Sequence, residues 1–232
     1  MGNAEQKPGG RYILYGGGVT RSLGPQMVLE EANLPYTLIV LDENRGDHRN
    51  PDYLAINPAG YIPALILPDG SVLHEAAAIM IHLAEHHRRD DLIPPPGDPL
   101  RGLFFCKLFY QTNDLQPAIR MFFKPEHYST DPTHRDSIRD RARETALDRW
   151  SVLDRYLQEN GPYTLGRRFS LADLHLTLWA AYGLDRPTTV TDRFSAIARC
   201  FGMTVSRPKI EPLIGKLQTD MLLFSKTTKD RA

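Results

Sequence analysis

The chain has 232 residues, of which 41% are hydrophobic and 24% are charged, an ordinary composition for a globular protein. Its 28 basic side chains balance its 28 acidic ones, so no long-range field favours a nucleic acid or an anionic membrane as a partner. Cys106 and Cys200 lie far apart in the sequence, which argues against a disulfide framework, a zinc knuckle or a dithiol redox centre.

The N-terminal stretch MGNAEQKPGG lacks the apolar core of a signal peptide, and Gln6 stands where a myristoylation motif requires serine or threonine. No run of the chain approaches the roughly 18 apolar residues of a membrane span. We therefore expect a cytoplasmic protein that engages neither membranes nor nucleic acids.

The first part of the chain alternates between strand and helix patterns. Short β-branched and aromatic runs predict four strands, at 11–16, 36–41, 63–67 and 71–74. The last two are joined by the turn Pro-Asp-Gly, which suits a hairpin. Apolar residues at intervals of three to four predict three helices, at 22–33, 51–56 and 75–87. This order predicts an α/β domain over residues 11–88, followed by a proline-rich linker at 89–98.

Helical spacing takes over beyond the linker, which predicts an all-helical domain over residues 99–225. Ser170 and Asp173 form a capping signature ahead of an apolar run, so we expect the Asp173 carboxylate to bind the first amides of a helix. The sequence Glu-Asn-Gly-Pro at 159–162 predicts the end of a long helix. The predicted fold class is therefore α/β plus all-α.

Two further patterns are weak. The glycines at 16–18 are typical of a dinucleotide-binding turn, but Arg21 stands where the third glycine of that motif is required. His82, Glu85, His86 and His87 could surround a metal, but their order differs from that of the zinc-binding helix motif. A solvated helix end is the preferred interpretation, and we expect no metal.

The stretch from Gly60 to Ile79 places a proline at a strand position and a glutamate at a helix start. Pro63 cannot join a central ladder, and a cis Ile62–Pro63 bond would leave the backbone of Ile62 available to a peptide-like ligand. Glu75 could hold an ammonium group, while the N–H of Ala76 at a helix N-terminus favours a carboxylate. The alternatives are a trans proline at a strand edge and a glutamate that only caps a helix.

The string YLAINPAGYIPALILPDGSVLHEAAAIMIHL resembles the glutathione-binding signature of the glutathione transferase superfamily, and the chain is most similar to its bacterial theta-like and beta-like members. The resemblance extends over residues 11–224 and includes FSLADLHL, which is similar to a capping motif of that family. It implies a thioredoxin-like N-terminal domain, an all-helical C-terminal domain, a homodimer, and glutathione as co-substrate. It implies glutathione-binding roles for seven residues: His48, Arg49, Tyr61, Ile62, Pro63, Glu75 and Ala76.

The chain departs from that signature at two positions. Ala76 replaces the usual serine or threonine, and the loss of one hydroxyl contact to a charged group costs roughly 1.5 to 3 kcal/mol. We expect this loss to weaken glutathione binding without forbidding it. Tyr61 replaces a polar residue that often reaches the glycyl carboxylate of glutathione, and either its hydroxyl, His48 or Arg49 can take that part.

A thiol of pKa about 8.5 needs about 2.7 kcal/mol to lower that pKa by two units. One hydroxyl donor and a helix N-terminus together supply a free energy of that size. The loop after the first strand offers Thr20 and Ser22 as candidate catalytic donors, with Tyr15 as the third choice. Arg21 occupies the position where beta-like members of the family place a cysteine. Because the loop has no cysteine, we expect the sulfur of glutathione itself to attack.

The resemblance implies a glutathione S-transferase that attacks a small apolar electrophile by conjugation, dehalogenation or ether cleavage, as in detoxification. A non-catalytic glutathione-binding or protein-interaction module and a glutathione-dependent peroxidase remain as alternatives. The residues expected at the electrophile pocket are Tyr15, Tyr110, Asn113, Asp114, Phe122 and Phe123.

Overall fold

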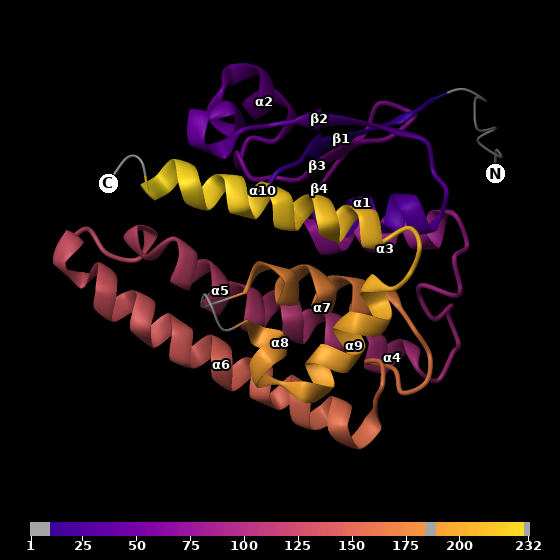
Figure 1. Cartoon of the computed structure of the whole chain (residues 1–232). Coiled ribbons are helices and arrows are strands. Elements are labelled where there is room, and N and C mark those ends of the chain that lie inside the picture. Colours follow the sequence, from indigo (N-terminus) through magenta and orange to yellow (C-terminus); the bar gives the residue numbers. More distant parts are fainter. Residues whose placement is uncertain (1–9, 184–188, 230–232) are drawn as a thin grey trace. The chain divides into compact units, whose positions relative to one another are not determined.

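The computed structural model describes residues 10–183 and 189–229, with only the backbone described over 222–229. The first nine residues of the N-terminal stretch considered above lie outside the described part. Contacts divide the described residues into two compact units, one within residues 1–87 and 215–232 and the other within residues 88–214. Figure 1 labels their elements. None of the described helices is long and apolar enough to cross a membrane.

The first unit is built on a four-stranded mixed sheet in the order β2-β1-β3-β4. Strand β1 is parallel to β2 and antiparallel to β3, and β3 is antiparallel to β4. The strands are β1 (Tyr12–Gly16), β2 (Tyr36–Val40), β3 (Ala64–Ile66) and β4 (Val72–His74). The four predicted strands are confirmed, and β3 is shorter than predicted because Pro63 has no N–H to give to the ladder.

Helices cover both faces of this sheet, with α1 and α3 on one side and α2 on the other (Figure 1). Along β1, Tyr12 and Leu14 are buried, while the alternate residue Tyr15 is half-buried and lies 5.6 Å from the Tyr53 ring of α2, centroid to centroid. The arrangement is thioredoxin-like, as expected. The helical segments are α1 (Leu23–Glu31), η1 (Glu43–Arg45), η2 (Asp47–Arg49), α2 (Pro51–Ile56) and α3 (Ala76–His86).

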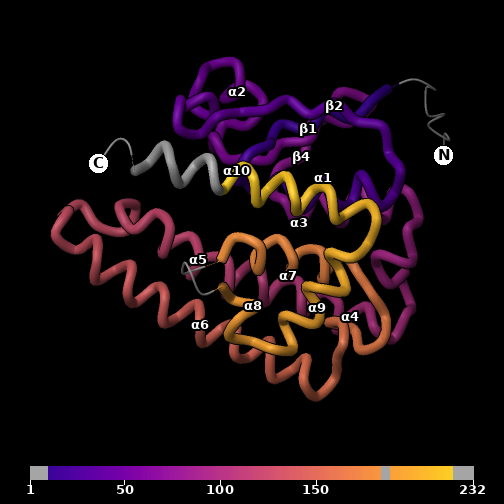
Figure 2. Tube along the Cα trace, in the orientation of Figure 1, coloured from indigo at the N-terminus to yellow at the C-terminus, as the bar shows by residue number. Residues whose placement is uncertain are grey.

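The second unit is helical, and Figure 2 traces its path. Helix α7 is buried on nearly all sides, which makes it the centre of this unit's core. The segments are α4 (Arg101–Tyr110), η3 (Gln111–Leu115), α5 (Gln116–Phe123), η4 (Pro125–His127), η5 (Pro132–His134), α6 (Arg135–Asn160), α7 (Leu171–Tyr182), α8 (Val190–Arg193) and α9 (Ser195–Val205). Helix α10 (Glu211–Lys229) begins here, and its part from Gly215 belongs to the first unit.

The helical pattern predicted over residues 100–123 is interrupted by the π-helical turn η3. Pro117 lacks an N–H and would clash with the preceding turn of a regular helix, so a wider turn before it relieves the conflict. The turn also directs the buried side chain of Gln111 inward. Its Nε2 donates to the carbonyl of Ala172 (3.1 Å), and its Oε1 lies 3.0 Å from Nδ1 of His175.

Asp173 caps α7, as its spacing from Ser170 predicts. Its fully buried carboxylate accepts hydrogen bonds from the amides of Thr164 (2.7 Å) and Ser170 (2.8 Å). Burial raises the pKa of Asp173 to about 6, against the opposing effect of these hydrogen bonds. Asp192 forms a second capping box, with Thr189, on the short helix α8, and its side chain is exposed.

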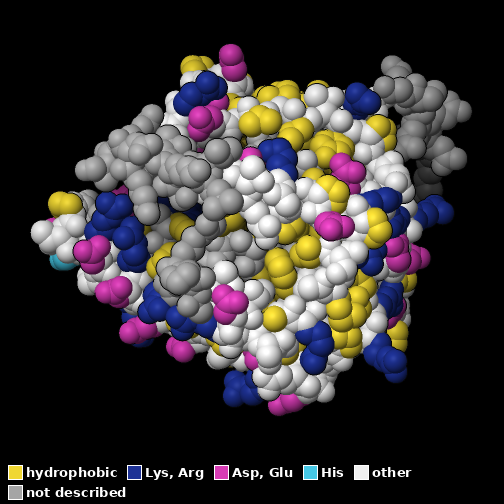
Figure 3. All heavy atoms as spheres, viewed as in Figure 1, with side chains coloured by type: hydrophobic (Ala, Val, Ile, Leu, Met, Phe, Trp, Pro, Cys, Tyr) yellow, Lys and Arg dark blue, Asp and Glu magenta, His cyan; other side chains and the backbone are white. Residues whose placement is uncertain are grey.

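The space-filling view shows basic and acidic side chains of the described residues interspersed on one face (Figure 3). This mixture agrees with the balanced charge of the chain. Surface electrostatics on that face therefore consist of short-range pairs rather than a broad field of one sign.

We expect Asp173→Ala to lower the free energy of unfolding by about 2 to 5 kcal/mol, because it leaves two buried amides without an acceptor. Asp173→Asn should lose less, because the amide oxygen still accepts. The matched control is Asp192→Ala, whose exposed capping box should contribute about 1 kcal/mol or less. Urea denaturation measures the free energy of unfolding of all three variants. Equal losses in Asp173→Ala and Asp192→Ala would show that burial of the Asp173 carboxylate does not increase its contribution to stability.

A histidine cluster lies at the end of α3. The Tyr12 hydroxyl lies 2.7 Å from Nε2 of His87, and the ring of His86 lies 5.4 Å from His82 and 5.0 Å from His87. Burial first, and the neighbouring histidines second, lower the pKa of His82 and of His87. The carboxylates of Asp69 and Glu85 act on His82 in the opposite direction. Among the described residues, no group of three His, Cys, Asp or Glu side chains could hold a metal ion.

This cluster predicts acid sensitivity of the fold. A histidine whose pKa is lowered by folding binds fewer protons in the folded state than in the unfolded state. Its contribution to stability is therefore full above pH about 6.5 and is lost as the pH falls through the folded pKa. We expect His86→Gln to reduce the loss of stability between about pH 7 and pH 5. His127→Gln, at an exposed position of the second unit, is the control, and identical pH profiles for both variants would refute the effect.

Candidate functional site

Several predicted residues of the first unit lie around the segment 61–63. The Ile62–Pro63 bond is cis, as considered from the sequence. The carbonyl of Tyr61 accepts hydrogen bonds from the Tyr53 hydroxyl (2.6 Å) and from Nδ2 of Asn57 (2.7 Å). Burial raises the pKa of Tyr53 to about 12, so its hydroxyl stays protonated and donates. Among the described residues, neither the amide nor the carbonyl of Ile62 has a backbone hydrogen bond.

The loop that carries His48 and Arg49 packs against this segment. Nη1 of Arg49 donates to the carbonyl of Ala59 at 3.5 Å. Gly60 has φ +63°, and a Cβ there would lie 2.8 Å from Nη1 of Arg49 and 3.0 Å from the carbonyl oxygen of His48. Glycine therefore permits both the backbone conformation and the close approach. The structure thus places His48 and Arg49 next to Gly60, the residue before Tyr61, and Arg49 is the more exposed of the two.

Glu75 has an unusual backbone conformation, with φ 66° and ψ 116°, immediately before α3. Its side chain makes no capping hydrogen bond and is 68% exposed, so the alternative of a helix-capping glutamate is wrong. A non-glycine residue in such a region costs about 1 to 3 kcal/mol and is typical of functional sites. Next to it, Ala76 is buried at the start of α3, where the first amides have no partner within the helix.

Thr20 and Ser22 form a closed ring of hydrogen bonds with Gly17. The Gly17 amide donates to Oγ of Ser22 (2.9 Å), and the two hydroxyl oxygens lie 2.8 Å apart. Oγ1 of Thr20 donates to the carbonyl of Gly17 (2.9 Å). Since the Thr20 hydrogen is used in that bond, Ser22 must donate to Thr20.

The ring uses both hydroxyl hydrogens inside the loop. Thr20 is 8% exposed and Ser22 is 1% exposed, so Thr20 is the more accessible of the two candidate donors. Gly16 makes room for the ring, because a Cβ there would lie 2.2 Å from Cβ of Ser22. Tyr15, the third candidate, packs against Tyr53 on the α2 side of the sheet.

Arg21 is a residue of this site that sequence reasoning missed. Its Nη1 lies 3.8 Å from Oε2 of Glu75, and its guanidinium carbon lies 6.0 Å from the centre of the Tyr61 ring. The only sequence signal was its position, where the resemblance places a cysteine in beta-like proteins. The structure thus joins the loop after β1 to the start of α3 through one charged side chain.

The other five residues expected at the electrophile pocket belong to the second unit. The Tyr110 hydroxyl donates to the carbonyl of Arg149 (3.1 Å), and Oδ1 of Asp114 lies 3.5 Å from Nε of Arg149. Asn113 is exposed, and the rings of Phe122 and Phe123 meet edge to face at 5.1 Å. Sequence reasoning missed Arg149, which organises two of these side chains.

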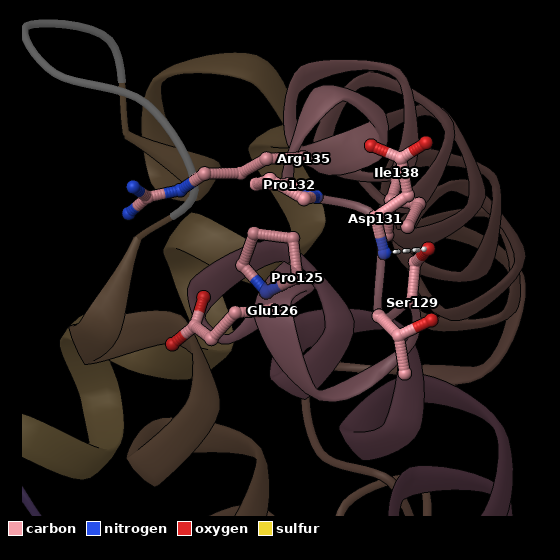
Figure 4. A pocket seen from close by; sticks show the side chains of 8 residues that line it. Pro125, Glu126, Ser129, Asp131, Pro132, Arg135 and Ile138 are labelled. Carbon is pink, nitrogen blue, oxygen red and sulfur yellow. Dashed lines mark hydrogen bonds between the residues drawn. The ribbon is translucent and has the colours of Figure 1, made fainter.

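A pocket of about 440 Å³ opens in the second unit, on the loop between α5 and α6 (Figure 4). Within it, Oγ of Ser129 accepts a hydrogen bond from the amide of Asp131 (3.1 Å), and the side chains of Glu126 and Arg135 extend to the same side. None of the residues expected at the electrophile pocket lines it. Its lining residues are Pro125, Glu126, Ser129, Thr130, Asp131, Pro132, Arg135 and Ile138.

Comparison with known proteins relates the chain to one family. The family model described as glutathione S-transferase, N-terminal domain, matches residues 21–86. Glutathione S-transferase 2 of Anopheles gambiae is 30% identical over 200 residues, 82% of this chain and 91% of that protein. Protein URE2 of Eremothecium gossypii is 31% identical over 180 residues, 72% of this chain and 47% of that protein. The crystal structure of a glutathione transferase homologue from Sulfitobacter, with bound glutathione, has a TM-score of 0.78 and 26% identity, covering 89% of this chain and 98% of that one.

The hydroxyl ring predicts a role for Ser22 in stability. Ser22→Ala leaves the buried amide of Gly17 without its acceptor and should lower the free energy of unfolding by about 1 to 3 kcal/mol. Ser151→Ala, which removes an exposed hydroxyl from α6, is the control and should change stability by less than about 0.5 kcal/mol. Denaturant melts of both variants test this, and an unchanged midpoint for Ser22→Ala would show that the ring contributes nothing.

Proposed function

The chain belongs to the glutathione S-transferase family, and on that premise we propose that it binds glutathione on its first unit and uses the ligand's sulfur as a nucleophile. The observation that carries the proposal is the conformation of Glu75. Its backbone lies in an energetically unfavourable region, while its carboxylate is exposed and does not cap the helix. Because the carboxylate does not cap its own helix and its pairing with Arg21 is longer than a hydrogen bond, it can accept hydrogen bonds from the ammonium group of a ligand.

The proposed ligand lies along the backbone of the first unit. The free amide and carbonyl of Ile62, positioned by Pro63, pair with the cysteinyl backbone of glutathione. Glu75 pairs with the ammonium group, and the Ala76 amide donates to the carboxylate at the γ-glutamyl end. Arg49 and His48 serve the glycyl carboxylate, with the Tyr61 hydroxyl as a further donor. Support for this arrangement comes from the packing of the His48 loop against Gly60.

For thiol activation we propose that Thr20 exchanges its acceptor. In the structure its hydroxyl donates to the Gly17 carbonyl, and in the proposed complex it donates to the sulfur. Ser22 continues to donate to Thr20, which polarises the Thr20 hydroxyl and strengthens its bond. The thiol proton leaves to water, and the resulting thiolate is stabilised by this hydroxyl and by the amides at the start of α1.

The thiolate then attacks an electrophile bound by the helical unit. A carbon–sulfur bond forms, and either a leaving group such as halide departs with the bonding electrons or an activated double bond takes up a proton. The residues that we propose to bind the electrophile are those expected from the sequence: Tyr15, Tyr110, Asn113, Asp114, Phe122 and Phe123. We also propose that the protein is a homodimer. The same thiolate could instead reduce a peroxide, with a second glutathione completing the disulfide.

A non-catalytic glutathione-binding module is the second candidate. It is favoured by the closed ring, in which both candidate hydroxyl donors are already used. The two candidates share the ligand and differ in whether its thiol is activated.

Calorimetry with glutathione, followed by thiolate absorbance against pH in the same samples, separates these candidates. We expect binding with a thiol pKa clearly below about 8.5. Thr20→Val should raise the pKa of the bound thiol by about one unit with little change in Kd. Glu75→Gln should weaken binding by about 10- to 100-fold and leave that pKa unchanged.

The outcomes lead to different conclusions. Binding without a lowered thiol pKa favours the non-catalytic module. A lowered pKa that Thr20→Val does not alter removes Thr20 as the activating donor. Absence of glutathione binding refutes the site at Ile62, Glu75 and Ala76.

A further inference from the structure

Arg21 carries a charge that the folded chain does not fully satisfy. Its side chain is only 22% exposed, and among the described residues its sole ion pair is the one with Glu75. The separation of 3.8 Å in that pair exceeds hydrogen-bond length. A guanidinium has five N–H donors, and a largely covered cation without a hydrogen-bonded acceptor is costly. The arrangement therefore suits an anion that arrives with a ligand.

The partner of Arg21 identifies which anion. Glu75 is the residue that binds the ligand's ammonium in the proposed function, on which this inference rests. In an α-amino acid the ammonium and the carboxylate are attached to the same carbon, so an ammonium at Glu75 brings a carboxylate within reach of a guanidinium only 3.8 Å from Glu75. The two side chains together are complementary to a zwitterion.

Arg21 can also replace a group that the chain lacks, the hydroxyl of a serine or threonine at position 76. Ala76 has no hydroxyl, so the carboxylate of such a ligand receives only backbone N–H groups from the start of α3. A guanidinium is a stronger partner for a carboxylate than a hydroxyl, because its donors are charged and can bind both oxygens. We propose that Arg21 binds the α-carboxylate of the γ-glutamyl residue, in place of a hydroxyl at position 76.

The main competing role for Arg21 is stabilisation of the thiolate. The contacts of its guanidinium favour the carboxylate role. Among the described residues, the guanidinium lies near the Glu75 carboxylate and the Tyr61 ring, and it makes no hydrogen bond to Thr20, Ser22 or Gly17. Arg21 thus acts on specificity for ligands that carry a free α-amino acid end, and not on the reacting atom.

Two tripeptide analogues test this assignment. 4-Aminobutanoyl-Cys-Gly lacks the α-carboxylate of glutathione, and glutaryl-Cys-Gly lacks the ammonium. We expect the parent protein to bind glutathione about 10- to 100-fold more tightly than the first analogue. Arg21→Gln should lose most of this preference and keep only the part that the backbone N–H groups at the start of α3 provide. It should still discriminate against glutaryl-Cys-Gly, because Glu75 is intact.

Two further variants separate a specific contact from general damage. Arg21→Lys keeps a charge without the planar fork and should retain part of the preference. Ala76→Ser in the Arg21→Gln background supplies the hydroxyl and should restore part of the affinity for glutathione but not for 4-aminobutanoyl-Cys-Gly. Circular dichroism and a thermal melt confirm that each variant is folded.

The result that overturns this inference is an equal loss of affinity for glutathione and 4-aminobutanoyl-Cys-Gly in Arg21→Gln. A rise in the pKa of the bound thiol in that variant, with ligand preference retained, also overturns it and assigns Arg21 to the sulfur. If the parent protein does not bind glutathione at all, the proposed function fails together with this inference. If the parent binds glutathione but Arg21→Gln gives either of the two results above, only this inference fails.

Discussion

The candidate site depends on the two hydrogen bonds that fix the carbonyl of Tyr61. The Tyr53 hydroxyl and the Asn57 side-chain amide, which belong to α2 and to the residue after it, both donate to this oxygen and fix its direction. The following residue, Ile62, consequently keeps its own backbone groups out of the ladder. The same anchor places the Tyr61 ring beside Arg21, so one carbonyl with two hydrogen bonds organises backbone and side-chain parts of the site.

The loop after β1 combines two demands that oppose each other. The hydroxyls of Thr20 and Ser22 stabilise the loop by bonding to each other and to Gly17, yet a hydroxyl that is to stabilise a thiolate must give up its internal acceptor. Exchange of one carbonyl acceptor for a charged sulfur is favourable in principle, because hydrogen bonds to charged groups are the stronger ones. The free energy lost when Thr20 gives up its hydrogen bond to Gly17 then reduces the net free energy of thiolate binding.

Sequence patterns predicted the parts of the structure that depend on local chemistry. Pro63 implied a break in the ladder, the Ser170 and Asp173 pair implied a cap, and the Pro-Asp-Gly turn implied a hairpin, because each effect acts within a few residues. Arg21 and the hydroxyl ring were not predicted, since both depend on which side chains meet after the loop closes on α3. For Glu75 the sequence permits either helix capping or ligand binding, and the missing capping hydrogen bond and the exposed side chain exclude capping.

The π-helical turn between α4 and α5 changes the phase of the helical surface. A π turn holds one residue more than an α-helical turn, which rotates every later side chain by about 100° around the axis. The aromatic residues of α5, Phe122 and Phe123, therefore face a different direction from the one that the register of α4 would give them. A single extra residue near Gln111 can thus exchange the set of side chains that α5 presents, while the buried contacts of α4 remain as they are.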